Sequence, residues 1–270
     1  MRRPEADTYT HGHHDSVLRS HRWRTVENSA AYLLPHLAAG VDLLDVGCGP
    51  GTITIDLAQR CAPGRVVGID SAADAITAAQ AAAAEAGVDN LELRVDDVYA
   101  LQVDDDSVDV VHAHQVLQHV ADPVAALREM RRVCRPGGVV AARDSIYRAF
   151  SWFPTDPRLT RWLEVYCAVA ESNGGEPDAG THLLSWATAA GFSEVRCSAT
   201  AWCYATPEER TWWGGLWAER TEATRLADQA VELGVATRDE LTEIAGAWRR
   251  WAEHADAWFA VPCGEILASP

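Results

Sequence analysis

The chain has 270 residues, enough to bury one substantial hydrophobic core. Its formal net charge of −16 at pH 7 argues against a protein that grips a phosphate backbone, and the lack of lysine removes Schiff-base chemistry. The seven cysteines show no C-x-x-C spacing, and no apolar run approaches the roughly 20 residues that span a bilayer. We therefore expect a cytoplasmic protein with no nucleic-acid partner, no disulfide framework and no membrane span.

Residues 1–40 predict a polar arm followed by a helix. The arm contains His11, His13 and His14. These three histidines cannot all reach one ion without an unusual turn, and no later spacing completes a ligand set, so we expect no metal. The helix is predicted from apolar residues that recur at helical spacing, namely Val26, Ala30, Leu33, Leu34 and Leu37.

A strand, a glycine turn and a helix are predicted next, in direct succession. Residues 41–46 form an apolar run suited to a buried parallel strand, and helical spacing resumes at Thr52. Gly47, Gly49 and Gly51 permit positive φ and leave no Cβ, so a nucleotide can lie against the main chain at the positive end of the helix. A dinucleotide fingerprint needs its third glycine where Thr52 stands, which disfavours a dehydrogenase.

Two further strands are predicted to end in carboxylates. Residues 66–70 end in Asp70, which could accept both hydroxyls of a ribose. Residues 91–97 end in Asp97, which could accept from an adenine amine.

A fourth strand is predicted at residues 108–114, followed by a fifth at 139–143. Ligands of open α/β sheets sit at the carboxyl ends of the strands. His114, Gln115 and His119 are therefore well placed by topology.

Taken in order, these motifs resemble the class I S-adenosylmethionine-dependent methyltransferases, nearest to the ubiquinone/menaquinone methyltransferase-like group, over about residues 43–144. The resemblance implies an α/β fold with a doubly wound, seven-stranded, mostly parallel, Rossmann-like sheet. It also implies S-adenosyl-L-methionine as cofactor and S-adenosyl-L-homocysteine as product. The cofactor-binding residues that it implies are Asp45, Gly47, Cys48, Gly49, Gly51, Asp70, Ser71, Asp97, Val98, His114 and Gln115.

The parts outside the cofactor-binding core, residues 41–147, are predicted to be helical additions and a return to the sheet. We expect a helical insertion and the return at 148–205, a helical cap insertion at 206–256, and the last strand at 257–270. Thr206 and Pro207 are typical of a helix start.

Catalysis by such an enzyme requires chiefly alignment, since orientation alone can supply roughly 7 to 11 kcal/mol of a barrier. A general base is needed only where the nucleophile must lose a proton. The candidates are His119, Asp144 and His11. In related enzymes an N-terminal segment folds over the cofactor, which Tyr9 or His11 could do here; a disordered tail is the alternative.

Aromatic residues are concentrated in the added segments, which suits a cap over a flat or greasy substrate. The candidate pocket residues are Tyr9, Tyr147, Trp152, Trp213 and Trp217. The alternative is that most of these rings form the core of the insertion itself.

The expected activity is methyl transfer to a small-molecule or modified-peptide acceptor in natural-product biosynthesis. Oxygen of a hydroxyl, phenol or carboxylate is the first choice of target, and carbon of a quinone-like ring the second. A cofactor-binding protein without turnover is the remaining alternative, and either a monomer or a homodimer is expected.

Overall fold

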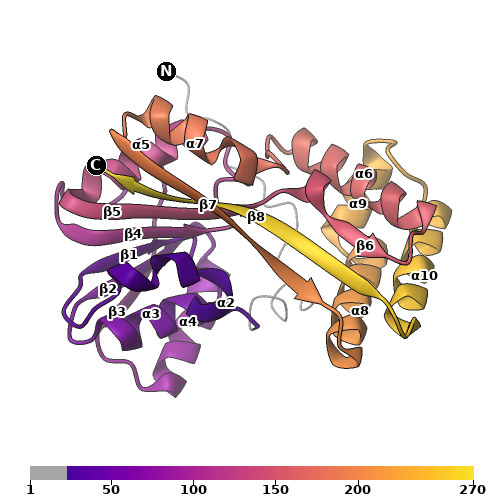
Figure 1. Cartoon of the computed structure of the whole chain (residues 1–270), viewed down its shortest axis with the longest axis horizontal. Helices are drawn as coiled ribbons and strands as arrows, with labels where there is room; N and C mark the ends of the chain where they lie inside the picture. The colour runs from indigo at the N-terminus through magenta and orange to yellow at the C-terminus, as the bar shows by residue number, and fades with distance from the viewer. Residues whose placement is uncertain (1–22) are drawn as a thin grey trace.

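A computed structural model describes residues 23–270 as an α/β sheet with a helical cap at one end (Figure 1). The strands are connected by hydrogen bonds in the order β3-β2-β1-β4-β5-β8-β6. β5 and β6 pair with successive parts of one edge of β8, and β7 pairs with the opposite edge. The strands of the described region are β1 (Leu43–Val46), β2 (Val66–Asp70), β3 (Leu91–Val95), β4 (Val108–His114), β5 (Cys134–Ser145), β6 (Ser151–Phe153), β7 (Glu194–Tyr204) and β8 (Trp258–Ser269).

The first five strands pair in parallel, whereas β8 is antiparallel to β5, β6 and β7. The predicted doubly wound, Rossmann-like sheet is therefore confirmed. It has eight strands instead of seven because the three-residue β6 pairs with the first part of β8. The sequence signal for β6 is masked by its proximity to Pro154, since proline usually ends a strand.

Helices cover both faces of the sheet, as Figure 1 shows. Short α2, η1 and α3 pack on the face that presents Leu43 and Val110, whereas α5 and α7 pack on the face that presents Leu44 and Val111. The alternation follows from the two-residue repeat of a strand. The helices described are α2 (Val26–Ser29), η1 (Ala31–His36), α3 (Thr52–Cys61), α4 (Ala73–Ala86), α5 (Pro123–Val133), η2 (Tyr147–Ala149), α6 (Pro157–Ser172), α7 (Ala179–Ala190), α8 (Pro207–Ala223), α9 (Arg225–Glu232) and α10 (Arg238–Glu253).

The N-terminal helix predicted from the apolar spacing is divided in two. Ala30 leaves the helical region at φ −138°, and the chain continues as the 3-10 turn η1. Pro35 lies inside η1 and has no N–H to donate to the carbonyl of Ala31, so a continuous α-helix would lack that bond.

The cap consists of α6, α8, α9 and α10 around a core of aromatic side chains. The ring of Trp162 lies 4.4 Å from that of Trp217 and 4.8 Å from that of Trp248, both edge to face. α8 begins with a capping box between Thr206 and Glu209, as the sequence predicted for its start. No helix within residues 23–270 is long and apolar enough to cross a membrane.

Trp162→Ala is expected to lower the free energy of unfolding by about 3 to 5 kcal/mol, the usual cost of emptying a large buried aromatic site. Trp162 is 1% exposed at the centre of the cap core, whereas Leu184 on α7 is 50% exposed. Leu184→Ala is the control, with an expected change within about 0.5 kcal/mol. Urea unfolding measures both, and equal losses in the two variants would contradict the central role of Trp162.

Candidate functional site

The glycine turn between β1 and α3 is packed too closely for side chains at two positions. Gly47 has φ +68° and Gly51 has φ +83°. A Cβ on Gly47 would overlap Val116, and one on Gly51 would lie 2.9 Å from the Cβ of Ala79. The turn thus needs glycine for its backbone conformation and for its contacts with the surrounding elements.

Asp45, at the end of β1, lies beneath this turn. One carboxylate oxygen accepts a hydrogen bond from the Thr54 hydroxyl at 2.6 Å, and the other lies 2.7 Å from Nδ1 of His112. All three side chains are buried. Asp45 therefore links β1 to α3 and β4. Its contribution to ligand binding is indirect, because it fixes the position of the glycine turn.

Asp70 ends β2 and faces the same turn. Its carboxylate accepts from the backbone N–H of Gly49 at 3.0 Å and from that of Ala72 at 2.9 Å. Each oxygen keeps lone-pair capacity for the hydroxyl groups of a ribose. Ser71 is exposed beside it.

Cys48 lies within the turn and is only partly buried. Burial, aided by the charges of Asp45 and Asp70, raises the pKa of its thiol well above its usual range. The thiol is thus neutral at physiological pH, and it lines the turn without the reactivity of a thiolate.

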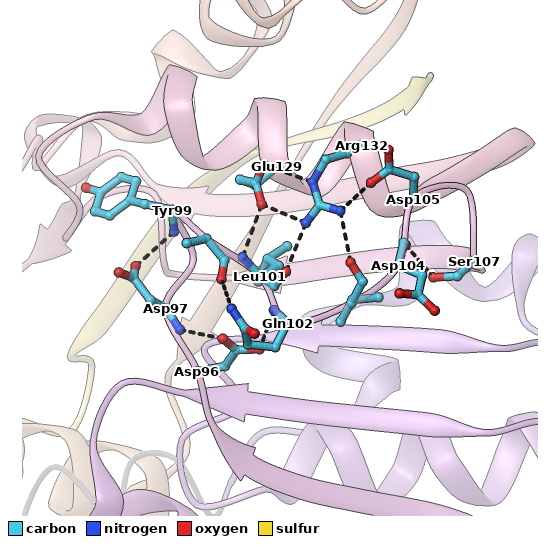
Figure 2. Close-up of polar contacts among 12 residues, drawn as sticks. Asp96, Asp97, Tyr99, Leu101, Gln102, Asp104, Asp105, Ser107, Glu129 and Arg132 are labelled. Carbon is cyan, nitrogen blue, oxygen red and sulfur yellow. Dashed lines mark hydrogen bonds and ion pairs between the residues drawn. The ribbon is translucent and has the colours of Figure 1, made fainter. Parts of the chain in front are cut away.

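Two adjacent acids after β3 have different surroundings (Figure 2). Asp96 is buried and accepts from the backbone N–H groups of Asp97 and Gln102 at 2.9 and 3.0 Å. Asp97 is exposed and accepts from the N–H of Tyr99 at 2.9 Å. Asp96 therefore shapes the loop, and Asp97 presents the carboxylate that the sequence predicted as an adenine contact, beside partly buried Val98.

A clamp from α5 holds this loop in place, as Figure 2 shows. The Arg132 guanidinium donates to the carbonyls of Leu101 and Val103, both at 2.9 Å, and to Asp105 at 2.6 Å. Glu129 accepts from the N–H of Leu101 at 3.1 Å. Sequence reasoning missed this pair, although an acid and an arginine three residues apart are a recognisable pattern of a helix.

The carboxyl end of β4 meets that of β5 through Gln115. This residue has φ +55°, an uncommon conformation for a side chain other than glycine, and its N–H donates to the carbonyl of Arg143 at 2.7 Å. Its amide nitrogen donates to the Ser145 hydroxyl at 2.6 Å, and its amide oxygen accepts from Arg24 at 3.1 Å. The ring of His114 lies next to it in sequence and 5.5 Å from the ring of Trp202.

Asp144 and His119 both contact Gln118, one through its backbone and the other through its side chain. Asp144 accepts from the N–H of Gln118 at 3.2 Å, and the side-chain nitrogen of Gln118 lies 3.1 Å from Nε2 of His119. Burial raises the pKa of Asp144 to about 8. Burial, with the charge of Arg24, lowers the pKa of His119 to about 3. At neutral pH Asp144 is thus largely a protonated acid and His119 a neutral imidazole.

The aromatic candidates lie mainly in packed cores. Trp213 and Trp217 are buried in the cap core, and Trp152 stacks on Phe259 at 5.8 Å. Tyr147 lies between core and cap, with its ring 4.1 Å from that of Tyr166. These positions favour the alternative that the rings are the cap's own core. Tyr9 and His11 lie outside the described residues, as do His13 and His14.

A shallow hollow exists at the opposite edge of the sheet, where β2 and β3 begin. It is lined by Pro63, Arg65, Asp89, Asn90, Leu91 and Glu92. It contains none of the predicted site residues and lies away from the carboxyl ends of the strands.

The stability of the protein should depend on pH through Asp144. Its ordinary pKa of 3.8 is raised to about 8, so between these values the folded protein holds a proton that the unfolded chain releases, and the free energy of unfolding falls as pH rises. His119 acts in the opposite sense, but only below its ordinary pKa of 6.5. Of the pKa shifts of Asp144 and His119, that of Asp144 is the one that changes stability between pH 6.5 and 8.

Asp144→Asn is therefore expected to flatten the loss of stability between pH 6.5 and 8, as measured by urea unfolding at several pH values. Exposed Asp104 provides the matched control, Asp104→Asn, which should keep the slope of the wild type. A slope that is unchanged in Asp144→Asn would show that this carboxyl titrates normally.

Gly47→Ala is expected to lower the affinity for S-adenosylhomocysteine by at least about tenfold, or 1.4 kcal/mol, because the new methyl group displaces Val116 from the turn. Gly87→Ala is the control, since Gly87 has φ +63° but no heavy atom within 4 Å of an added Cβ. Calorimetric titration compares them. If the two variants bound S-adenosylhomocysteine with equal affinity, the contact between the new methyl group and Val116 would not be the cause of any loss.

Comparison with known proteins agrees with this geometry. Residues 37–202 match the family described as methyltransferase domain. An uncharacterized methyltransferase of Schizosaccharomyces pombe is 31% identical over 270 aligned residues, which cover 96% of this chain and 95% of that protein. The ubiquinone/menaquinone biosynthesis C-methyltransferase UbiE of Bdellovibrio bacteriovorus is 39% identical over 102 residues, 38% of this chain and 43% of that protein.

The fold is also similar to that in the crystal structure of the (4+2)-cyclase SpnF. The TM-score is 0.54 at 21% identity, over 94% of this chain and 81% of that chain. Because the family match spans most of the sheet and the nearly full-length relative carries the same name, the chain belongs to the class I S-adenosylmethionine-dependent methyltransferases.

Proposed function

We propose that the protein transfers a methyl group to an oxygen atom of a small organic acceptor. When bound, S-adenosylmethionine supplies an activated methyl group and a neutral thioether leaving group. The residues present suit this cofactor, because the turn at Gly47 and Gly51 has no room for side chains and Asp70 and Asp97 keep free acceptor capacity. Asp70 would hold the ribose and Asp97 the adenine.

The observation that carries the choice of oxygen is the pair of titratable groups near the ends of β4 and β5. The acceptor nitrogen Nε2 of neutral His119 accepts from the side-chain amide of Gln118, so His119 takes the proton of a hydroxyl or phenol once that group replaces Gln118 at Nε2. Protonated Asp144 can donate a hydrogen bond to the acceptor. We assign these residues to proton transfer and to substrate orientation respectively. His11 remains a further candidate base.

Two alternatives have specific support. Methylation of carbon in a quinone-like ring is favoured by the similarity to UbiE, whose name states that activity. Cofactor binding without methyl transfer is favoured by the likeness to SpnF, which is named a cyclase on the same fold.

We further propose that the acceptor is a small molecule or a modified peptide of natural-product biosynthesis, and that the enzyme acts in the cytoplasm as a monomer or homodimer. Free cysteines in the described part of the chain support a reducing compartment. Tyr147 and Trp152, at the junction of core and cap, are the best placed of the proposed pocket residues, ahead of Trp213 and Trp217 in the cap core.

Incubation with a methyl donor labelled in its methyl carbon, followed by mass spectrometry of small molecules and peptides in a cell extract, tests the function. The carbon-13 chemical shift of the product separates a methyl group on oxygen from one on carbon. We expect an O-methyl product. A labelled C-methyl product would establish the quinone-type alternative, and binding of both sulfur nucleosides without any labelled product would favour a protein without turnover.

Asp70→Ala is expected to weaken S-adenosylhomocysteine binding by at least about tenfold, since hydrogen bonds to a charged group are worth roughly 1.5 to 3 kcal/mol each. Asp74→Ala, an exposed acid in the first turn of α4, is the matched control. Calorimetry with NAD as a further ligand checks the cofactor class. An unchanged affinity in Asp70→Ala would remove the ribose assignment.

A further inference from the structure

One face of the sheet carries a row of polar side chains at the site edge. Asp45 pairs in register with His112, His114 pairs with Arg143, and Arg143 pairs with Glu265. Residues that are paired in register project from the same face. The residues of the same face that lie two positions before Asp45, His112 and Arg143 are apolar, namely Leu43, Val110 and Ala141. The polar side chains therefore begin where the strands approach their carboxyl ends.

Arg143 is the charged centre of this row and is 1% exposed. Its Nε donates to Glu265 at 3.1 Å and to the Thr200 hydroxyl at 3.2 Å, but Nη1 and Nη2 have no hydrogen-bond partner. Glu265 also accepts hydrogen bonds from the hydroxyls of Ser198, at 2.7 Å, and Thr200. Its carboxylate is therefore divided among three donors and does not neutralise Arg143 alone. A buried guanidinium with both terminal nitrogens unsatisfied is costly, which points to an acceptor that binds there.

The surroundings of Arg143 favour an anion. Its guanidinium carbon lies 4.5 Å from the centre of the Trp202 ring, and that of Arg24 lies 5.4 Å from the same ring. The Tyr32 hydroxyl and Nε2 of His112, on the same side of the sheet, are also buried without partners. Burial raises the pKa of Tyr32, and Arg143 is the strongest charge that opposes the rise, so the hydroxyl stays a neutral donor.

We propose that Arg143 binds a carboxylate group of the methyl acceptor, an inference that rests on the proposed function. Two terminal guanidinium nitrogens match the two oxygens of a carboxylate in a bidentate pair. The acceptor is favoured over the cofactor because of strand order. The glycine turn and Asp70 follow β1 and β2, whereas Arg143 lies on β5, on the far side of β4. The acceptor is thus an organic acid, anchored by Arg143 beside Gln115.

Thermal unfolding with saturating S-adenosylhomocysteine tests the proposal, because a ligand that binds the folded state raises the melting temperature. The probes are acetate, benzoate, 3-phenylpropanoate and octanoate, each compared with its uncharged primary amide at the same millimolar concentration. We expect at least one carboxylate to stabilise the wild type where its amide does not. Equal behaviour of all four acids and their amides would overturn the proposal.

Two variants of opposite expected sign guard against a simple folding defect. Arg143→Gln should abolish the preference for the acid, with at least about tenfold weaker binding. Glu265→Gln should strengthen acid binding, because it removes the carboxylate that already shares the guanidinium. Arg196→Gln, an exposed arginine on β7, makes the same charge change and should leave the preference intact. A preference that survives in Arg143→Gln would overturn the assignment.

Titration of the same variants with S-adenosylhomocysteine alone separates the two proposals. We expect Arg143→Gln to bind it as the wild type does. 5′-Methylthioadenosine lacks the amino-acid carboxylate of S-adenosylhomocysteine. If Arg143→Gln lost affinity for S-adenosylhomocysteine but kept its affinity for 5′-methylthioadenosine, Arg143 would bind the cofactor carboxylate, and the inference would be overturned. A wild type that does not bind S-adenosylhomocysteine would instead overturn the proposed function.

Discussion

The buried carboxylate of Asp45 is the constraint on which the rest of the site depends. It accepts from Thr54 in the first turn of α3 and lies within hydrogen-bond distance of His112 on β4, so one side chain sets the relative position of three elements. The glycine turn runs between two of these elements, and its amide at Gly49 in turn fixes Asp70. A buried charge is tolerated only when hydrogen bonds satisfy it, which explains why a threonine and a histidine stand at these positions.

The chemistry of the same edge of the sheet suits two kinds of ligand. The loops after β1, β2 and β3 offer backbone N–H groups and carboxylates, which suit the hydroxyls and amine of a nucleoside. The ends of β4 and β5 offer imidazole, guanidinium and a protonated acid, which suit proton transfer and an anion. Gln115 lies between the two regions, and its strained backbone is held by bonds to Arg143, Ser145 and Arg24.

The sequence predicted the sheet well, and it singled out the glycine turn and the acids beside it, because these signals are local. Glycine at Gly47 and Gly51, and acids at the ends of apolar runs, are dictated by backbone geometry that a short segment reveals. The partners of Asp45 could not be predicted in this way, since His112 lies 67 residues away and reaches it only when β1 and β4 pair. Arg143 likewise looks like an ordinary strand residue until register brings Glu265 beside it.

The aromatic segments were ambiguous for a different reason. A tryptophan that packs in a core and one that lines a pocket have the same helical spacing, and only the assembled cap separates them. Trp217 is surrounded by other rings, whereas Trp202 lies at the boundary, in contact with His114 and two arginines. Trp202 carried no special sequence signal beyond its place in the segment predicted to return to the sheet.

Strand β8 has a mechanical consequence for the whole enzyme. Its early residues, such as Phe259, belong to the cap core, and its later residues, such as Ile266, belong to the sheet core. It is paired with β7 from Tyr204 to Glu194 without interruption, as Figure 1 makes visible. A hinge between the cap and the sheet would have to break this ladder of hydrogen bonds, so the pairing of β7 with β8 opposes any bending motion between the two parts.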